Sequence, residues 1–91
     1  MLTLKTTSRF RKDYKLARKR GLDLSLLETV IDMLLKEKPL DFKHRDHALT
    51  GDYTGFRECH ILSDWLLIYS INQETLILTA SRTGTHSDLF G

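Results

Sequence analysis

Apolar and polar positions divide the chain into an N-terminal part with helical periodicity and a C-terminal part with the periodicity of strands. Residues 2–6 alternate between apolar and polar types, which predicts a short strand with one buried face. From Ser8 to about Arg20 apolar residues recur at i, i+4 and i+7, which predicts a helix with one packing face. Ser8 is the expected N-cap of this helix and Gly21 its C-terminal stop.

A second helix is predicted directly after the first. Asp23 and Ser25 are both suitable N-caps, and the helix is expected to continue to about Lys38 because Pro39 cannot extend it. Its apolar stripe consists of Leu27, Val30, Ile31 and Leu34, widened by Leu26, Met33 and Leu35. The two helices would form a hairpin whose apolar sides need a sheet to cover them.

The remainder predicts a sheet. Residues 40–54 are polar and predict a loop that contacts the core through Leu49, and residues 83–91 predict a mobile polar tail. The three predicted strands are Phe56–Leu62, Trp65–Ile71 and Thr75–Arg82, joined by connections of hairpin length. The second is apolar on both faces and is therefore expected at the centre of the sheet. The fold class is α+β in the order β-α-α-β-β-β, with the helical hairpin on one face of a small, mainly antiparallel sheet.

Composition limits the class of protein. With 91 residues, the chain has room for one domain spanning 1–91, and 41% hydrophobic with 29% charged residues suits a globular protein. The longest apolar run is far shorter than a membrane-spanning helix, and the first residues form no signal segment. The single cysteine, Cys59, excludes an internal disulfide. We expect a cytoplasmic protein with no membrane association.

The net charge of +2 conceals a strong asymmetry. Residues 1–20 carry eight cations and one anion, a net +7, so the remaining chain has a net charge of −5. A dense basic helix is either a solvated face or a surface that binds a polyanion such as nucleic acid or an acidic protein. The residues that lie away from the apolar face, and form the expected docking surface, are Arg11, Lys15, Arg18 and Lys19.

Four histidines lie outside the helices and are the main candidates for chemistry. His44 and His47 have the spacing of metal ligands, which His60 and Asp64 could complete, but no Cys pair or His-Glu-x-x-His motif supports a metal site. We therefore expect no metal or other cofactor, and a structural, hydrogen-bonded role for His44. Cys59 is expected to be a core residue rather than a nucleophile, because strand neighbours such as His60 point to the opposite face.

Phosphodiester cleavage by the 2′-OH of RNA suits the remaining groups. This reaction needs a base, an acid and a cation beside the anionic phosphorane. Suitable side chains are those of His47, His60, Asp64, Arg82 and His86. Composition permits this reaction without establishing it.

Four motifs, in order along nearly the whole chain, resemble the YafQ-type toxins of the RelE/ParE superfamily. They are Asp46–Gly51 (DHALTG), Phe56–Ile61 (FRECHI), Asp64–Tyr69 (DWLLIY) and Arg82–Phe90 (RTGTHSDLF). The resemblance implies a RelE-like fold and a metal-independent mRNA interferase of a type II toxin–antitoxin system, which cuts messenger RNA in the A site of the 70S ribosome. It also implies a DinJ-like antitoxin, which inhibits the toxin and with it binds operator DNA.

The resemblance also assigns roles to individual residues. It implies acid–base catalysis by His47, His60, Asp64 and His86, with Arg82 at the scissile phosphate. Phe90 and Trp65 are then aromatic residues of the substrate site, although the strand pattern alone places Trp65 in the core. From the chemistry we expect His86 to be the acid, and His47 or His60 to be the base. Asp64 is expected to orient an imidazole.

Two other functions remain open from the residues alone. A ParE-like toxin that is not a nuclease would share the fold, but such toxins lack the histidine set present here. A non-catalytic RNA-binding module would explain the basic helix but would not explain the presence of His47, His60 and His86.

Overall fold

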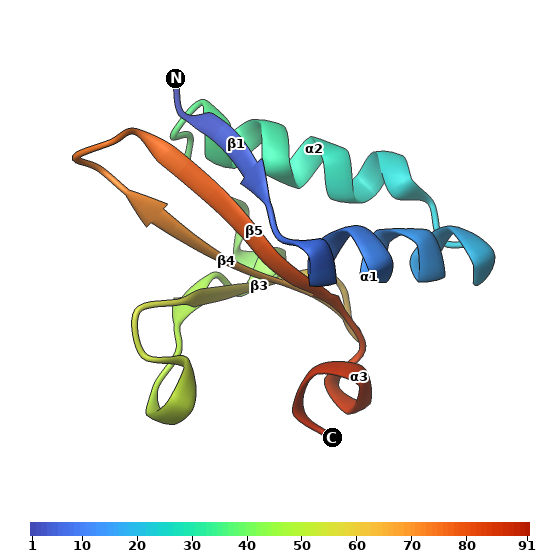
Figure 1. The fold of residues 1–91 in the computed structure, drawn as a ribbon. Helices are drawn as coiled ribbons and strands as arrows, with labels where there is room; N and C mark the ends of the chain where they lie inside the picture. The colour runs from blue at the N-terminus through green and yellow to red at the C-terminus, as the bar shows by residue number, and fades with distance from the viewer.

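A mixed five-stranded sheet forms the centre of the molecule, described for residues 1–91 by a computed structural model (Figure 1). Its strands are β1 (Thr3–Thr6), β2 (His47–Ala48), β3 (Arg57–Leu62), β4 (Trp65–Asn72) and β5 (Ile77–Gly84). They lie in the order β1-β5-β4-β3-β2, and only the β1–β5 pair is parallel. The predicted α+β class, the mainly antiparallel sheet and the central place of β4 are confirmed.

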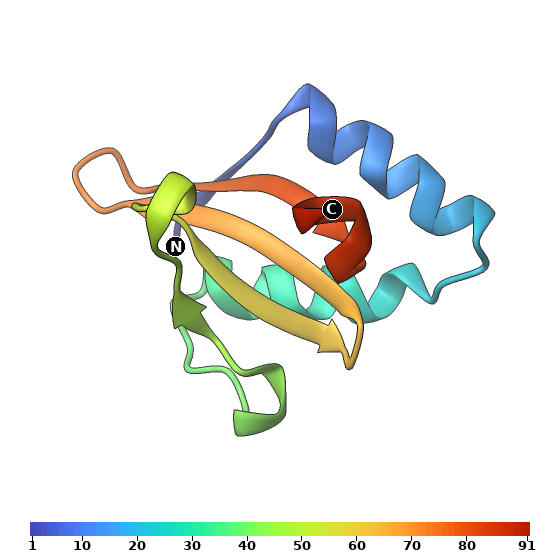
Figure 2. The same ribbon diagram turned by 90° about the horizontal axis from the view of Figure 1, so that it is seen from below.

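The two long helices, α1 (Ser8–Lys19) and α2 (Leu24–Leu35), cover one face of the sheet (Figures 1 and 2). Alternation along β3 sends Cys59 and Ile61 into the main core beneath them, together with the buried stripe of α2. The short helix α3 (His86–Phe90) lies on the opposite face, where Leu89 packs on a smaller cluster around Leu66 and Ile68 of β4. The sheet therefore has two covered faces, and the smaller cluster supports the surface that carries the histidines.

The helix ends differ slightly from the sequence prediction. Thr7, not Ser8, is the N-cap of α1, because its extended backbone lets the hydroxyl accept the amide N–H of Phe10 at 3.0 Å. Asp23 caps α2 as one of the two predicted alternatives. This helix ends at Leu35, before the predicted Lys38, because Glu37 adopts a left-handed conformation with φ 56°.

The segments predicted as loop and tail contain short ordered elements. The loop holds two 3₁₀ turns, η1 (Phe42–His44) and η2 (Gly51–Tyr53), and the strand β2. Leu49 packs on the smaller cluster, as predicted. The tail is not an irregular segment but α3, because Thr85 and Asp88 form a reciprocal capping box and Leu89 is buried. None of the helices has the length and hydropathy that crossing a bilayer requires.

Candidate active site

The sheet face opposite α1 and α2 carries the candidate site, and β3 supplies its centre. Since side chains alternate along a strand, Glu58 and His60 point away from the main core formed by their neighbours. Strand β2 pairs antiparallel with β3 and places His47 directly opposite Glu58. Two histidines that are 13 positions apart in sequence thereby flank one acidic side chain.

Glu58 is a buried carboxylate between these two imidazoles. Only 5% of its surface is exposed, and its Oε1 lies 3.8 Å from Nε2 of His47 and 3.5 Å from Nε2 of His60. Glu58 is not among the site residues predicted from the sequence, although its position two residues before His60 in an alternating strand places both on one face. Both imidazoles thus face one oxygen of the same buried carboxylate.

A second carboxylate–imidazole pair lies across the site. Asp64 occupies the tight turn between β3 and β4, and its Oδ1 accepts hydrogen bonds from the backbone N–H of His86 at 2.9 Å and from the ring Nδ1 at 2.7 Å. These hydrogen bonds, that of the backbone first, lower the pKa of Asp64 below its ordinary value. The imidazole that Asp64 contacts is thus that of His86, and Nε2 is the ring nitrogen that this hydrogen bond leaves free.

The aromatic rings lie close together on this surface. The ring centroids of His60 and His86 are 5.8 Å apart, and that of Phe90 is 6.4 Å from His86. Phe90 is half-exposed and packs edge-on against Tyr53 of η2, with centroids 5.4 Å apart. The structure thus brings His47, His60, Asp64, His86 and Phe90 onto one surface.

The guanidinium of Arg82 does not point towards the histidines, as a residue that binds the scissile phosphate was expected to do. Its Cα pairs with Ile68 on the histidine side of the sheet, but the guanidinium turns to the edge of β5 and binds Asp13 of α1. Nε and Nη2 lie 2.6 and 3.2 Å from the two carboxylate oxygens, and this bonding is the main cause that raises the pKa of Arg82. Arg82 makes no hydrogen bond to the four acid–base candidates.

Trp65 lies in the main core on the helix side of the sheet. It is 2% exposed, and its indole N–H donates to the hydroxyl of Thr83 at 2.9 Å. Thr83 in turn donates to the backbone oxygen of Leu66 at 2.7 Å. The structure therefore gives Trp65 the core position that the strand pattern indicated and leaves no surface of its ring beside His86.

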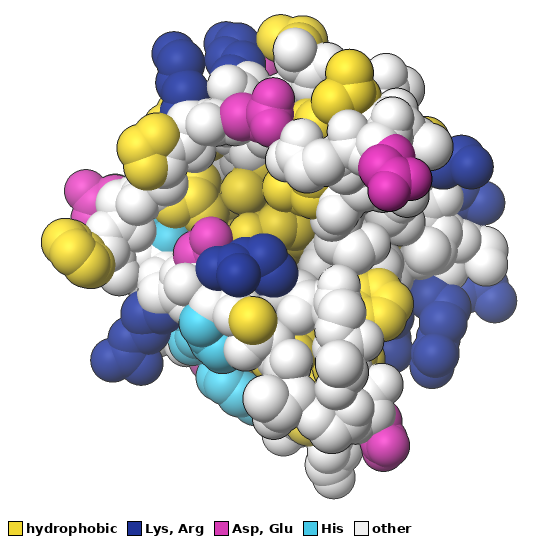
Figure 3. Space-filling model, turned by 90° about the vertical axis from the view of Figure 1, so that its left-hand side faces the viewer, with side chains coloured by type: hydrophobic (Ala, Val, Ile, Leu, Met, Phe, Trp, Pro, Cys, Tyr) yellow, Lys and Arg dark blue, Asp and Glu magenta, His cyan; other side chains and the backbone are white.

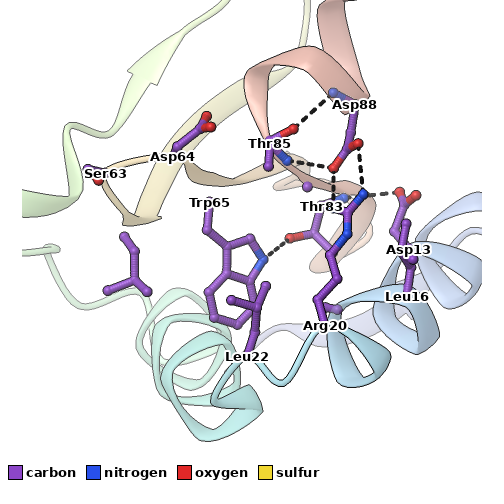
Figure 4. A pocket seen from close by; sticks show the side chains of 13 residues that line it. Asp13, Leu16, Arg20, Leu22, Ser63, Asp64, Trp65, Thr83, Thr85 and Asp88 are labelled. Atoms are coloured by element: carbon purple, nitrogen blue, oxygen red, sulfur yellow. Dashed lines mark hydrogen bonds and ion pairs between the residues drawn. The ribbon is translucent and has the colours of Figure 1, made fainter.

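An ion pair between Arg20, at the end of α1, and Asp88 of α3 joins the two helices (Figure 4). Arg20 contacts both oxygens of Asp88, at 2.6 and 3.2 Å, and the same carboxylate accepts the backbone N–H of Thr85 at 2.9 Å. Gly84 permits this approach, because a Cβ there would lie 2.9 Å from Oδ2 of Asp88. A cavity of about 250 Å³ lies beneath the bridge. Arg20, Asp88 and Gly84 thus position the helix that carries His86, a role that the sequence analysis did not predict.

The segment that precedes His47 is fastened to the sheet as well. Asp46 accepts hydrogen bonds from the hydroxyl of Tyr69 and, at 3.3–3.4 Å, from the guanidinium of Arg57. Burial raises the pKa of Tyr69, which belongs to the core as expected. The hollow beside this contact measures about 380 Å³, and Figure 3 shows its apolar floor with histidine side chains next to it.

One set of side chains has the geometry of a metal site. Ligand atoms of Glu58, His60 and His86 all lie within 4.8 Å of one another. This is not the set that the sequence spacing suggested, because the ring Nδ1 of His44 contacts the backbone oxygen of His60 at 2.7 Å. The expected structural role of His44 is confirmed.

The expected docking residues of α1 are exposed and free of acidic partners. None of them forms an ion pair, and we call this set the basic face: Arg11, Lys15, Arg18 and Lys19. Arg20, the next cation, is excluded because Asp88 binds it. The basic face therefore remains available to an anionic partner.

Comparison with known proteins identifies the family to which the chain belongs. Residues 2–91 match the sequence profile of the family described as the bacterial toxin of type II toxin–antitoxin system, YafQ. This chain belongs to the YafQ toxin family. The resemblance noted in the sequence is confirmed, and the chain is a toxin of a type II toxin–antitoxin system.

Three relatives of this YafQ-family toxin illustrate the match. The mRNA interferase toxin YafQ of Escherichia coli K12 is 38% identical over 86 residues, which is 93% of this chain and 91% of the relative. A metal-bound toxin from Helicobacter pylori is 46% identical with a TM-score of 0.94, over 99% of this chain and all of that one. YafQ in the E. coli DinJ–YafQ complex is 36% identical with a TM-score of 0.91, over the whole of both chains.

Proposed function

We propose that this toxin is an mRNA interferase, an endoribonuclease that cuts messenger RNA in the A site of the ribosome and stops translation. The observation that carries the proposal is the pair His60 and His86, 5.8 Å apart, each with its own carboxylate. An acid and a base on either side of one phosphate are what cleavage by the neighbouring 2′-OH requires.

The reaction begins when a base removes the proton of the 2′-OH, whose oxygen then attacks phosphorus. The P–O5′ bond breaks, and the acid gives its proton to the departing 5′-oxygen. His86 is the acid, because Asp64 holds its Nδ1 and stabilises the imidazolium that must donate from Nε2. His60 or His47 is the base, and Glu58 stabilises the charge that either ring gains.

In this proposal two further residues bind the substrate and a third supports the site from the core. Arg82 is the proposed phosphate-binding residue, and this role requires its guanidinium to exchange Asp13, which binds it in this structure, for the phosphorane. Phe90, half-exposed beside His86, contacts a base of the message. Trp65 acts from the core, where its hydrogen bond to Thr83 supports the end of β5.

Dependence on the ribosome follows from the size and charge of the molecule. The basic face binds ribosomal RNA phosphate, and a 91-residue domain has little surface with which to orient a message by itself. A DinJ-like antitoxin is the proposed inhibitor, since the E. coli relative has been solved as a DinJ–YafQ complex. Together with this antitoxin, the toxin binds operator DNA.

A transition-metal ion fits Glu58, His60 and His86, and the H. pylori relative is a metal-bound toxin. An ion held there would neutralise charge at the phosphate, but it would bind the ring nitrogens that the proton transfers need. We therefore propose a metal-independent reaction, which Cu²⁺ inhibits. Cleavage that resists added Cu²⁺, or that requires a metal after chelation, would contradict this part of the proposal.

Primer extension on a translated message tests the function. The wild-type toxin should give discrete cuts in the reading frame that require active translation. His86→Ala and Asp64→Ala should abolish both the cuts and growth arrest while leaving the circular dichroism spectrum unchanged. A toxin that arrests growth without cutting would instead be a ParE-like non-nuclease, and binding of RNA without cutting would indicate a non-catalytic module.

A further inference from the structure

The 3₁₀ turn η1 presents an aromatic side chain with no intramolecular role. Phe42 is 99% exposed, whereas the other phenylalanines of the chain contact the core or the site. Single exposed apolar residues are common on protein surfaces, so exposure alone indicates nothing. The cations that follow Phe42 and the contacts of its turn with the histidines are what indicate a binding role.

The turn is held rigidly although its tip is exposed. The carboxylate of Asp41 accepts the backbone N–H of Lys43 at 3.0 Å, and the backbone N–H of Arg45 donates to the oxygen of Phe42 at 3.0 Å. Arg45 then adopts a left-handed conformation, with φ 47°, which turns the chain back to the sheet. The turn that carries Phe42 lies at an edge of the sheet, beyond β2 and β3 (Figure 2).

Two contacts connect this turn to the candidate active site. The ring of His44 contacts the backbone oxygen of His60 at 2.7 Å, and the ring of His47 contacts the backbone oxygen of Arg45 at 2.6 Å. Phe42 is only two residues from His44, so extended chain sets its Cα within about 7 Å of that of His44. Phe42 is thus two residues from a side chain that contacts the backbone of His60.

Two unpaired cations, Lys43 and Arg45, follow Phe42 in the turn, and the carboxylate of Asp41 before it is bonded to the backbone N–H of Lys43. Lys43 and Arg45 are exposed, and neither forms an ion pair or a side-chain hydrogen bond. Both line a groove of about 540 Å³ between η1, α2 and the end of β3, which His60 borders, while Phe42 stands outside the groove beside them. This volume lies within the range of about 300–1,000 Å³ found for ligand sites.

We propose that Phe42, Lys43 and Arg45 form a second RNA-binding subsite, in which a base of the message stacks on Phe42 and its phosphates lie against the two cations. The combination of an aromatic face with unpaired cations is how proteins bind single-stranded RNA without reading its sequence. The occupant is the message rather than ribosomal RNA, because the turn is bonded to the histidines that act on the scissile strand. This inference rests on the proposed function and deepens it by extending the substrate site past the scissile phosphate.

Binding of a single-stranded RNA decamer, made uncleavable by 2′-O-methyl groups, tests the subsite by fluorescence anisotropy at low ionic strength. Phe42→Ala should weaken binding about tenfold, near the lower end of base–aromatic stacking. Phe42→Trp should retain wild-type affinity, whereas Phe42→Leu should weaken binding as Ala does, because leucine is apolar but has no π face. Replacing both Lys43 and Arg45 by Gln should reduce the salt slope of log Kd by about 1.4, since each phosphate contact on a single strand contributes about 0.7.

The matched control changes the same kinds of residue at the far edge of the sheet. Leu4→Ala with Lys5→Gln removes an exposed leucine and a cation from β1 and should leave RNA affinity unchanged. Equal affinity of wild type and Phe42→Ala, or of the Trp and Leu variants, would overturn the inference, as would an undetectable affinity of wild type. A Phe42→Ala variant that binds RNA normally but loses affinity for the antitoxin would assign this surface to a protein partner and overturn it as well.

Programmed ribosomes distinguish the two RNA sources and separate this inference from the proposed function. With p-benzoylphenylalanine at position 42, the photo-crosslink should form to the message near the cut, and a crosslink to ribosomal RNA would refute the subsite. If Phe42 governs RNA affinity while no message is ever cut, only the proposed function fails. If cutting persists at wild-type levels without Phe42 affecting affinity, only the subsite fails.

Discussion

The ion pair between Asp13 and Arg82 makes a quantitative prediction, because it joins α1 to the end of β5. One carboxylate receives three hydrogen bonds: two from the guanidinium, at 2.6 and 3.2 Å, and one from the backbone N–H of Thr83 at 3.2 Å. The side chains are only 13% and 16% exposed. Asp13→Ala therefore removes a mostly buried network and leaves the cation of Arg82 without a partner.

The magnitude lies between two measured limits. An exposed ion pair contributes about 0.2–1 kcal/mol, whereas removing one partner of a fully buried pair costs about 3–5 kcal/mol. The residual exposure of this pair places Asp13→Ala at about 2 kcal/mol of lost stability. For a domain of this size that corresponds to a fall of about 8–16 °C in Tm.

Thermal and urea unfolding followed by circular dichroism measure this loss. The control is Asp32→Ala, because Asp32 pairs with Lys36 at 2.9 Å on the exposed face of α2, and its loss should change stability by no more than about 0.5 kcal/mol. The double variant Asp13→Ala with Arg82→Met should be more stable than Asp13→Ala alone, since no unpaired cation remains. Equal Tm values for Asp13→Ala and Asp32→Ala would refute the reasoning.

Three further predictions concern the site, its docking and its acid stability. Gly84→Ala should strongly reduce message cleavage while lowering Tm only slightly, because the new Cβ would displace the carboxylate of Asp88 that holds α3. A loss of cleavage no greater than the loss of stability accounts for would show that this carboxylate has no positioning role. Reversing the charge of three residues of the basic face should reduce co-sedimentation with ribosomes while the His86–Asp64 contact is retained, and unchanged co-sedimentation would exclude this face. Hydrogen bonds from His86 lower the pKa of Asp64, and hydrogen bonds mainly from Arg20 lower the pKa of Asp88. The two ionised carboxylates therefore stabilise the folded protein above about pH 4, and this stabilisation is lost as the pH falls through their pKa values in the folded state. Urea midpoints measured down to pH 2 should therefore decrease, and the Asp64→Asn variant should show a shallower decrease.

Local patterns predicted the elements of this fold well because each element has its own periodicity. The stripe of α2 and the doubly apolar run of β4 are properties of adjacent residues, and both led to the observed positions. The errors occur where the decisive interaction is short or involves the backbone. Glu37 ends α2 through a left-handed backbone, and five residues of α3 are too few to show a helical period.

The candidate site was predictable in its residue types but not in its pairing. Histidines and the turn carboxylate stand out in the sequence, yet only the register of β2 against β3 reveals that Glu58 lies between His47 and His60. The contact of Arg20 with Asp88 spans 68 positions, and no local pattern encodes it. Pairings that are set by the approach of distant elements are therefore what the structure adds.

These distant contacts change the interpretation of the charge asymmetry. The sequence suggests that α1 is a docking helix, but Asp13 binds Arg82, and Arg20, at the C-cap of α1, binds α3. The helix that presents the basic face to solvent is thus bonded on its other side to the proposed phosphate-binding residue and to the helix that carries His86. Any force on α1 from a docked polyanion acts on both groups at once, so the proposed ribosome binding and the alignment of the proposed catalytic residues depend on one helix. Variants of the basic face should therefore weaken docking alone, whereas Asp13→Ala should impair cleavage by toxin that is already docked.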